Sequence, residues 1–323
     1  MKGRIYLVKL IDYFYREPLM KLRIAKEKGL VLWDKKESQP YIFMVDGRIP
    51  HGGMFDRLKG LITIYAVAKT LGKDFRINWT YPFMLSKYLI PSKYNWLIDE
   101  SQMNFGIFSY HNVIAYGEYV GPNRLMKSRA KETHFYYGYN SLNEVNKVFG
   151  TNYSWGELYR ELFQPTPYLR RYLDCYSAEI GLKYVAIHAR FLNLLGDKVE
   201  TAINPELASD KEKEKLVELV ISAVRNISSS HPHVRVMIAS DSMVFINRIK
   251  LEIPNVYIVP GEVKHIDTAG ATDDAENIKM FTDYYLISGA QKVYSLWHEG
   301  MWKSAFPEYA ALIGGVPFER IVF

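Results

Sequence analysis

The sequence contains a single cysteine, Cys175, among its 323 residues. One thiol forms neither an internal disulfide nor a cysteine-rich zinc site, so the chain suits a reducing compartment and we expect it in the cytoplasm. No apolar stretch approaches the roughly 18 residues that mark a membrane-spanning helix. The N-terminus also lacks the apolar core and small-residue cleavage site of a signal peptide.

Several motifs that carry cofactor chemistry are missing from the sequence. There is no D-x-D, by which many sugar transferases hold a divalent metal, and no H-E-x-x-H zinc motif. There is no G-x-x-x-x-G-K-[ST] phosphate loop, and no G-x-G-x-x-G of nicotinamide dehydrogenases. We therefore expect a protein that uses neither a metal nor an organic cofactor.

The charge is mildly positive, with a formal net charge of +6. The basic residues are dispersed with no run of five, which argues against a nucleic-acid partner and suits an anionic small substrate. The composition is 48% hydrophobic and 24% charged, as in a folded globular protein. Aromatic residues reach 15%, with 25 Tyr and 6 Trp, which suits either core packing or stacking on sugar rings.

The N-terminal segment 4–27 mixes Leu, Ile, Tyr and Phe with Lys and Arg. This pattern fits a helix lying on a membrane surface, although Pro18 interrupts it. A helix packed on the protein's own surface explains the same pattern. Peripheral membrane contact through this segment is therefore one of two open interpretations.

The N-terminal half begins with a pattern typical of a βαβ unit. A buried-type strand at 41–46 leads into a glycine-containing loop, a helix follows at 55–71, and a second strand follows at 74–79. Residues 80–140 are aromatic-rich and irregular, and no element is predicted there. Further helices are expected at 141–149, 154–162 and 168–180.

The C-terminal half repeats the alternation of strands and helices. Two prolines in FQPTP (163–167) stiffen a connector and mark the expected domain boundary. We therefore predict an α/β protein of two Rossmann-like domains, 1–165 and 166–323, facing each other across a cleft. The expected strands are 183–189, 234–240, 256–259 and 291–296, and the expected helices are 210–227, 242–251, 275–289 and 302–313.

The sharpest chemical signal is His188 and Arg190, at the carboxyl end of strand 183–189. Alternation along a strand places both side chains on one face, where a phosphate can accept from an imidazole and a guanidinium. A structural ion pair at a strand end is the commoner role of such residues, and spacing alone does not separate the two interpretations.

The motifs around this pair resemble those of the GDP-fucose-dependent fucosyltransferases, a superfamily that includes α1,2-, α1,6- and protein O-fucosyltransferases. IHAR followed by Gly196-Asp197 resembles their H-x-R signature, and the other motifs follow in the family's order. The resemblance covers roughly residues 41–320 and implies a GT-B fold. The matching strings are GGMFDRLKGL (52–61), LFQPTP (162–167), VMIASD (236–241), FTDYYLIS (281–288) and SAFPEYAALIGG (304–315).

The resemblance implies an inverting transfer of a sugar, with fucose expected, from a GDP-sugar donor to a glycan acceptor, and the missing D-x-D predicts that the transfer needs no metal. The missing anchor and disulfides of secretory-pathway enzymes favour an acceptor glycan of bacterial type. The C-terminal domain would bind the donor, and the N-terminal domain would bind the acceptor. Arg190 would bind the β-phosphate and His188 the phosphate–ribose region. Asp283 would accept from guanine, Asp241 would shape the pocket, and Ser304 and Ala305 would offer a hydroxyl and backbone N–H groups at a helix start.

The glycine loop supplies further candidates. Gly52, Gly53 and Arg57 would contact substrate, and His51 and Asp56 are candidates for the general base. His298 and Glu299, beside the expected nucleotide site, are alternative bases.

Other roles remain open for most of these residues. His51, Asp56 and Arg57 could serve only to shape the loop. Asp241 could cap helix 242–251, and Asp283 could pair with a surface lysine.

The sequence also departs from the family pattern. Phe191 stands where a second arginine is usual, His298-Glu299 stands where a serine pair is usual, and the loop to Asp197 is longer. A transferase for another nucleotide-sugar, or a non-catalytic nucleotide- or glycan-binding protein, is therefore an alternative.

Overall fold

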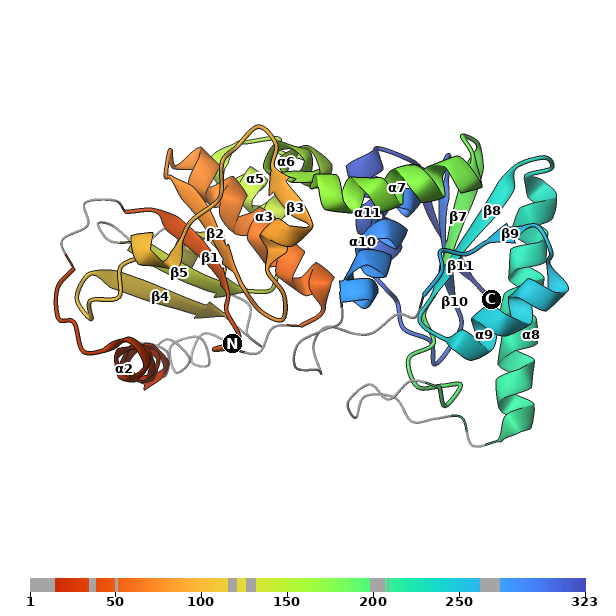
Figure 1. Ribbon diagram of the computed structural model, residues 1–323, viewed down its shortest axis with the longest axis horizontal. Coiled ribbons are helices and arrows are strands. Elements are labelled where there is room, and N and C mark those ends of the chain that lie inside the picture. Colours follow the sequence, from red (N-terminus) through yellow and green to blue (C-terminus); the bar gives the residue numbers. More distant parts are fainter. Residues whose placement is uncertain are drawn as a thin grey trace. The chain divides into compact units, whose positions relative to one another are not determined.

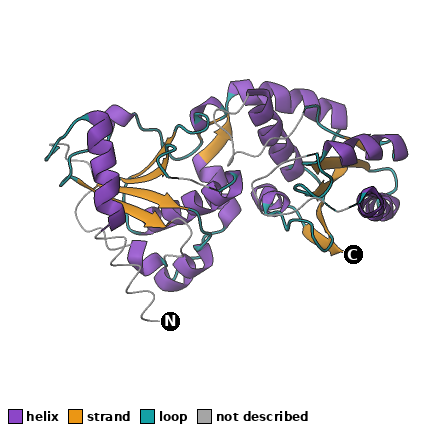
Figure 2. Cartoon of the chain, turned by 90° about the horizontal axis from the view of Figure 1, so that it is seen from below, coloured by secondary structure: helices purple, strands orange, loops and turns teal. Residues whose placement is uncertain are grey.

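The computed structural model describes residues 15–34, 39–49, 52–115, 121–125, 132–197, 207, 209–261 and 274–323. The chain divides into two units. The first consists of Met1–Ser86 and Pro91–Gln164, and the second of Lys87–Ile90 and Pro165–Phe323. Helices and strands alternate in both (Figure 2).

The first unit is built on a parallel sheet of four strands in the order β2-β1-β5-β4. Helix α3 (Met54–Thr70) connects the first two strands and confirms the predicted βαβ unit. It covers one face of the sheet, and α2 (Glu17–Lys28) covers the other (Figure 1). The strands are β1 (Tyr41–Val45), β2 (Phe75–Trp79), β4 (Tyr110–Ala115) and β5 (Glu132–Tyr137).

Gly60 explains how closely α3 packs on the sheet. A Cβ at this position would lie 1.9 Å from the backbone oxygen of Tyr137, at the carboxyl end of β5. No side chain fits in that space, so glycine lets the helix approach the strand.

Half of this sheet, β4 and β5, lies in the region 80–140, where the sequence predicted no element. All six residues of β5 are buried, although Glu132 and His134 are polar. The Glu132 carboxylate satisfies its bonding internally: it accepts from His134 Nε2 at 2.6 Å and from the backbone and side-chain nitrogens of Asn104, both at 2.8 Å. Polar residues inside a central strand break the apolar pattern that predictions rely on.

The remaining elements of the first unit are short or lie near its boundary. Helices α5 and α6 agree with the predicted 141–149 and 154–162 within one residue. The bounds are η2 (Leu85–Lys87), β3 (Leu89–Pro91), η3 (Glu100–Gln102), α4 (Pro122–Leu125), α5 (Leu142–Phe149), α6 (Trp155–Leu162) and β6 (Phe163–Pro165).

The second unit holds a parallel sheet of five strands in the order β11-β10-β7-β8-β9. Helices α8 and α9 cover one face, and α7, α10 and α11 cover the other (Figure 1). The strands are β7 (Tyr184–Ala189), β8 (Arg235–Ser240), β9 (Val256–Tyr257), β10 (Val293–Trp297) and β11 (Phe318–Val322). The helices are α7 (Pro167–Ile180), α8 (Asp210–Ser230), α9 (Met243–Glu252), α10 (Asp274–Ser288) and α11 (Phe306–Gly314).

Residues 87–90 belong to the second unit although they come from the N-terminal half of the sequence. Lys87 forms an ion pair of 2.7 Å with Asp274, at the start of α10. Tyr88 donates its hydroxyl to the same carboxylate and stacks on Phe281, with ring centroids 4.9 Å apart. No local sequence pattern marks this segment as part of the second unit, because each contact joins residues nearly two hundred positions apart.

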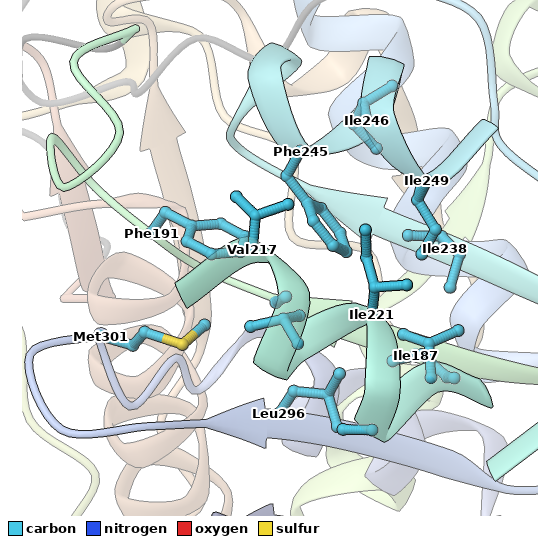
Figure 3. Packing of buried hydrophobic residues seen from close by; sticks show 14 of the residues in the cluster. Ile187, Phe191, Val217, Ile221, Ile238, Phe245, Ile246, Ile249, Leu296 and Met301 are labelled. Atoms are coloured by element: carbon cyan, nitrogen blue, oxygen red, sulfur yellow. The ribbon is translucent and has the colours of Figure 1, made fainter. Parts of the chain in front are cut away.

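The core of the second unit lies between its sheet and α8 and α9 (Figure 3). Ile187 and Ile238 from the central strands meet Val217 and Ile221 from α8. Two details differ from prediction: α11 starts at Phe306 instead of 302, and β11 was not predicted. β11 is an edge strand with half-exposed residues, which weakens the sequence signal of a buried strand.

No helix within the described residues is both long enough and apolar enough to cross a membrane. In α2, Pro18 occupies the first turn, where proline is tolerated, instead of interrupting the helix.

Candidate functional site

The sheet of the second unit has a topological switch point between β7 and β10. In chain order its strands run 3-2-1-4-5: the chain proceeds from β7 through β8 to β9 on one side, then from β10 to β11 on the other. In open α/β sheets, ligands bind beyond the carboxyl ends of the two strands where the order reverses. Here those ends lead into Arg190 after β7 and His298 after β10.

Arg190 is held at this point and remains accessible. Its side chain is 17% exposed, and its Nε lies 3.8 Å from Asp241 Oδ2, at the end of the neighbouring strand β8. Its carbonyl oxygen accepts from the backbone N–H of Trp302, which ties the segment after β10 to the end of β7. The guanidinium therefore stands at the switch point, where it can meet an anionic ligand.

Asp241 shapes the turn that follows β7. Its two carboxylate oxygens accept from the backbone N–H groups of Phe191 and Leu192, at 2.8 and 2.9 Å. Leu192 has a φ of 55°, a conformation that such bonds help to hold. Asp241 thus holds a turn, and its expected part in a nucleotide pocket stays a prediction. The alternative, that it caps the next helix, is wrong.

The cap of α9 comes from Ser242 and Asp197 instead. Ser242 Oγ accepts from the N–H of Phe245, and Asp197 Oδ2 accepts from the N–H of Val244 at 2.8 Å and from the Ser242 hydroxyl. Asp197, in the segment after β7, thus reaches the start of α9 and stabilises the helix N-terminus.

Phe191, which replaces the family's second arginine, is completely buried. Its ring lies 5.0 Å from that of Phe245 on α9, within the apolar core (Figure 3). The side chain at this position therefore supports the core and does not face a ligand.

His188 lies one residue before the end of β7 and is 8% exposed. Its ring is stacked on Phe306, the first residue of α11, with centroids 5.5 Å apart. Phe306 in turn meets Tyr284 of α10 edge-on. The sequence did not indicate Phe306 as a partner, because a lone aromatic residue at a helix start carries no specific signal.

Ser304 and Ala305 were expected to offer N–H groups from the first turn of a helix, and this is wrong in detail. The helix begins two residues later than Ser304, and Ala305 is its N-cap. The Ser304 N–H already donates to Trp302 O, and Ser304 Oγ accepts from the N–H of Phe306 at 3.2 Å. Pro307 carries no N–H, so this helix start offers few donors.

Asp283 lies inside the second unit. Its Oδ2 is 2.8 Å from Lys279 Nζ, one turn earlier on α10, and the two side chains are only 4% and 6% exposed. Its Oδ1 is buried and has no hydrogen-bond partner among the described residues. Burial raises the pKa of Asp283, and Lys279 opposes that rise. The alternative interpretation, that Asp283 pairs with a surface lysine, is right about the lysine partner and wrong about its exposure, because Lys279 is buried. The i,i+4 spacing could have indicated it.

In the first unit, Arg57 and the two glycines form a structural loop. Gly53 is the N-cap of α3, and Arg57 is 2% exposed. Arg57 donates to the carbonyls of Gly52 and Tyr81, at 2.9 and 3.0 Å, and its guanidinium lies over the Trp79 ring. This geometry supports the loop-shaping alternative for Arg57.

The candidate bases are distributed over both units. Asp56, with 51% of its side chain exposed, pairs with Lys59 at 3.0 Å. His298 and Glu299 are exposed or half-exposed at the end of β10, and His298 Nδ1 lies 3.0 Å from the Glu299 carbonyl. His51 lies outside the described residues.

Within the described ranges, no three His, Cys, Asp or Glu side chains come together as a metal site. The carboxyl edge of the second sheet carries an accessible, oriented guanidinium, Arg190, and a largely buried imidazole, His188, both at the end of β7. Such a set suits binding of a phosphate group.

Solved structures with a similar fold are fucosyltransferases. NodZ α1,6-fucosyltransferase with GDP matches with a TM-score of 0.54 and 13% identity, over 85% of this chain and 93% of that one. NodZ from Bradyrhizobium matches with a TM-score of 0.52 and 14% identity over the same shares. FUT1 of Arabidopsis thaliana in complex with GDP matches with a TM-score of 0.57 and 11% identity, over 93% of this chain and 74% of that one.

The chain has the fold of the GDP-fucose-dependent fucosyltransferases. The predicted α/β class with two Rossmann-like units of GT-B type is therefore confirmed. No protein-family model matches the sequence, and no curated protein sequence matches it. At 11% to 14% identity, the similarity to the solved structures is one of fold.

Proposed function

We propose that the protein is a glycosyltransferase that moves a sugar, with fucose as the first candidate, from a GDP-sugar to a hydroxyl group of a glycan. The observation that carries this proposal is the position of Arg190 at the switch point of the second sheet, beside Asp241. The similar solved structures include fucosyltransferases bound to GDP and soaked with GDP-fucose, which supports the choice of donor.

The reaction breaks the bond between the anomeric carbon and the β-phosphate oxygen, while an acceptor hydroxyl forms the new bond from the opposite side with inversion. Negative charge accumulates on the departing diphosphate, and the hydroxyl loses its proton. A guanidinium fixed before the reaction stabilises that charge without reorganising. Arg190 would do this directly and without a metal on the diphosphate, and His188 would contact the phosphate–ribose region.

The buried carboxylate of Asp283 is the proposed acceptor for the guanine base. Its Oδ1 has no hydrogen-bond partner in the described chain, and a buried acceptor without a donor is unfavourable. A purine that donates from its ring and amino nitrogens would satisfy that oxygen. Uracil, which carries one ring N–H and no amino group, would satisfy it less well.

The first unit would bind the acceptor glycan. Gly52, Gly53 and Asp56 border the loop before α3, at the carboxyl end of β1. Asp56 and His51 are candidates for the base that takes the hydroxyl proton, as are His298 and Glu299. A rate that stays constant from pH 5 to pH 9 would argue against either histidine.

Calorimetric titration with GDP, UDP and GDP-fucose in EDTA tests the donor site. We expect metal-free binding that prefers GDP and is lost in Arg190→Ala. Arg225→Ala is the matched control, because Arg225 is an exposed arginine of the same unit that pairs with Glu252. Binding of all three nucleotides with equal affinity, or unchanged binding by Arg190→Ala, would contradict the proposed site.

Transfer is tested separately with labelled GDP-fucose and a panel of glycan acceptors. Arg190→Ala should lower turnover by about 10²- to 10³-fold, the usual effect of removing one such donor. GDP binding without transfer or donor hydrolysis would instead favour a non-catalytic nucleotide-binding protein.

A further inference from the structure

The first unit exposes four consecutive apolar residues directly after α2. Leu30, Val31, Leu32 and Trp33 are 68%, 43%, 51% and 67% exposed. Single exposed apolar residues are ordinary on protein surfaces, whereas an exposed run of this length that ends in tryptophan is not. Such a patch indicates a surface that is covered in the protein's working environment.

The run is held in place by its neighbours. The N–H groups of Ile107 and Phe108 donate to the carbonyls of Val31 and Leu32, at 2.9 and 3.1 Å. The Trp33 ring lies 4.8 Å from the ring of Phe108, which is itself 46% exposed. The fold therefore presents these side chains to the outside in a fixed arrangement.

Tight backbone packing underlies this arrangement. A Cβ on Gly106 would lie 2.7 Å from the backbone nitrogen of Asp34, so glycine permits the two segments to meet. The same Asp34 N–H donates to Ser109 Oγ at 2.7 Å. These contacts fix the C-terminal end of the exposed run to the segment that leads into β4.

Helix α2 carries a second apolar stripe on its outer side. Leu19 and Leu22 are 49% and 60% exposed, and they share one helix face with the exposed Lys26. Met20 and Ile24 are buried against the sheet on the other side. A helix that needed only to pack on its own protein would have no reason to be apolar on both sides.

Charge decides among the occupants of this surface. Residues 15–34 contain five basic and three acidic side chains, and the exposed Arg23, Lys26 and Lys28 precede the apolar run. Arg23 pairs with Glu27 and Lys28 with Glu100, so the charge that favours an anionic surface is the excess of basic over acidic side chains in this segment. A second copy of the chain would bring the same positive surface opposite itself. A neutral glycan would gain nothing from the cations. An anionic bilayer complements both the charge and the apolar side chains.

We propose that this apolar patch, Leu19, Leu22, Leu30, Val31, Leu32, Trp33 and Phe108, docks the protein on an anionic lipid bilayer. The side chains of Leu30, Leu32 and Trp33 enter the headgroup region, where tryptophan is favoured, and the cations of α2 lie at the lipid phosphates. The proposal does not depend on sugar transfer. It places membrane contact at residues 19–33 and 108, whereas the sequence indicated 4–27.

Sedimentation of the full-length chain with vesicles tests this docking. We expect binding to vesicles of phosphatidylglycerol and phosphatidylcholine that falls with salt, and little binding to phosphatidylcholine alone. Leu32→Ser/Trp33→Ser should weaken binding at least about tenfold, since burial of one large apolar side chain is worth roughly that factor. The matched control is Leu182→Ser/Leu251→Ser, which alters exposed leucines of the second unit, 98% and 81% exposed.

Quenching by brominated lipids provides a second measurement. Fluorescence of the native chain should be quenched on vesicle binding, and the quenching should be largely lost in Trp33→Ser. Absence of vesicle binding, or equal binding by the Leu32/Trp33 double variant, would overturn the proposal. So would light scattering that shows a dimer dispersed by the same substitutions, or retention on a neutral glycan without vesicle binding.

Discussion

The buried ion pair on α10 allows a prediction with both a sign and a size. Lys279 and Asp283 are 6% and 4% exposed at their side chains, and their charged atoms lie 2.8 Å apart. Lys279→Met keeps the length and apolar stem of the side chain but leaves the carboxyl group without its counter-charge. Loss of one partner of a buried pair costs about 3–5 kcal/mol of the free energy of unfolding.

This loss depends on pH in a defined direction. Burial raises the pKa of Asp283 in the folded protein, and without Lys279 it would rise further. Between the unfolded pKa of about 3.9 and the raised folded pKa, the folded state keeps a proton that the unfolded state has released. The free energy of unfolding of Lys279→Met should therefore fall as pH rises through this window, by up to about 1.4 kcal/mol per pH unit, and level off above the folded pKa.

Urea unfolding of the second unit, followed by fluorescence at pH 4.5 and pH 8, measures this effect. We expect Lys279→Met to be close to the native chain at the lower pH and several kcal/mol less stable at the higher one. The double variant Lys279→Met/Asp283→Leu should recover most of the loss, since it leaves no buried charge. Lys250→Met, on the exposed side of α9, is the control and should stay within about 0.5 kcal/mol of the native chain. If Lys279→Met had the same stability as the native chain at both pH values, the reasoning would be refuted.

Three further substitutions test how the sites are held. Gly60→Ala should destabilise the first unit by about 1–3 kcal/mol in urea unfolding, because its Cβ would meet Tyr137 O at 1.9 Å; stability equal to the native chain would contradict that close contact. Phe191→Arg would place an arginine where the family has its second one, but at a completely buried position. We expect the free energy of unfolding to fall by at least about 3 kcal/mol with no gain in GDP affinity. Tighter GDP binding would show that this side chain can face the ligand. Asp197→Ala should cost about 1 kcal/mol through loss of the bond to Val244 N–H, with turnover little changed; a large loss of turnover at unchanged stability would indicate a direct catalytic role.

The parts of the fold that the sequence predicted well are those with a local signal. Strand 41–46, helix 55–71 and strand 74–79 appear within a few residues of their predicted bounds. Apolar periodicity and glycine or proline at the ends determine such elements, because the signal and the structure lie in the same stretch of chain. The strands β4 and β5 were missed since buried polar residues, such as Asn112 in β4 and Glu132 in β5, interrupt the apolar pattern of a buried strand.

The features of the site also divide into those with a local sequence signal and those that depend on long-range contacts. The position of His188 and Arg190 at a strand end, and the likeness of their surroundings to the fucosyltransferase motifs, could be read from the sequence. The strand order that makes this end a switch point could not, since it depends on which strands pair. Nor could the sequence choose between the two roles considered for Asp241, which binds the turn after β7 while Asp197 caps α9.

By itself the sequence determined the α/β class and most helices and strands, and it indicated candidates for binding a phosphate. Each of these follows from side-chain chemistry and spacing within about twenty residues. The tertiary structure decided which of those residues are accessible. It buried Phe191, Arg57 and Asp283, left Arg190 open at the switch point, and exposed Trp33. Exposure is a property of long-range packing, in which each side chain is covered by residues that the local sequence does not contain.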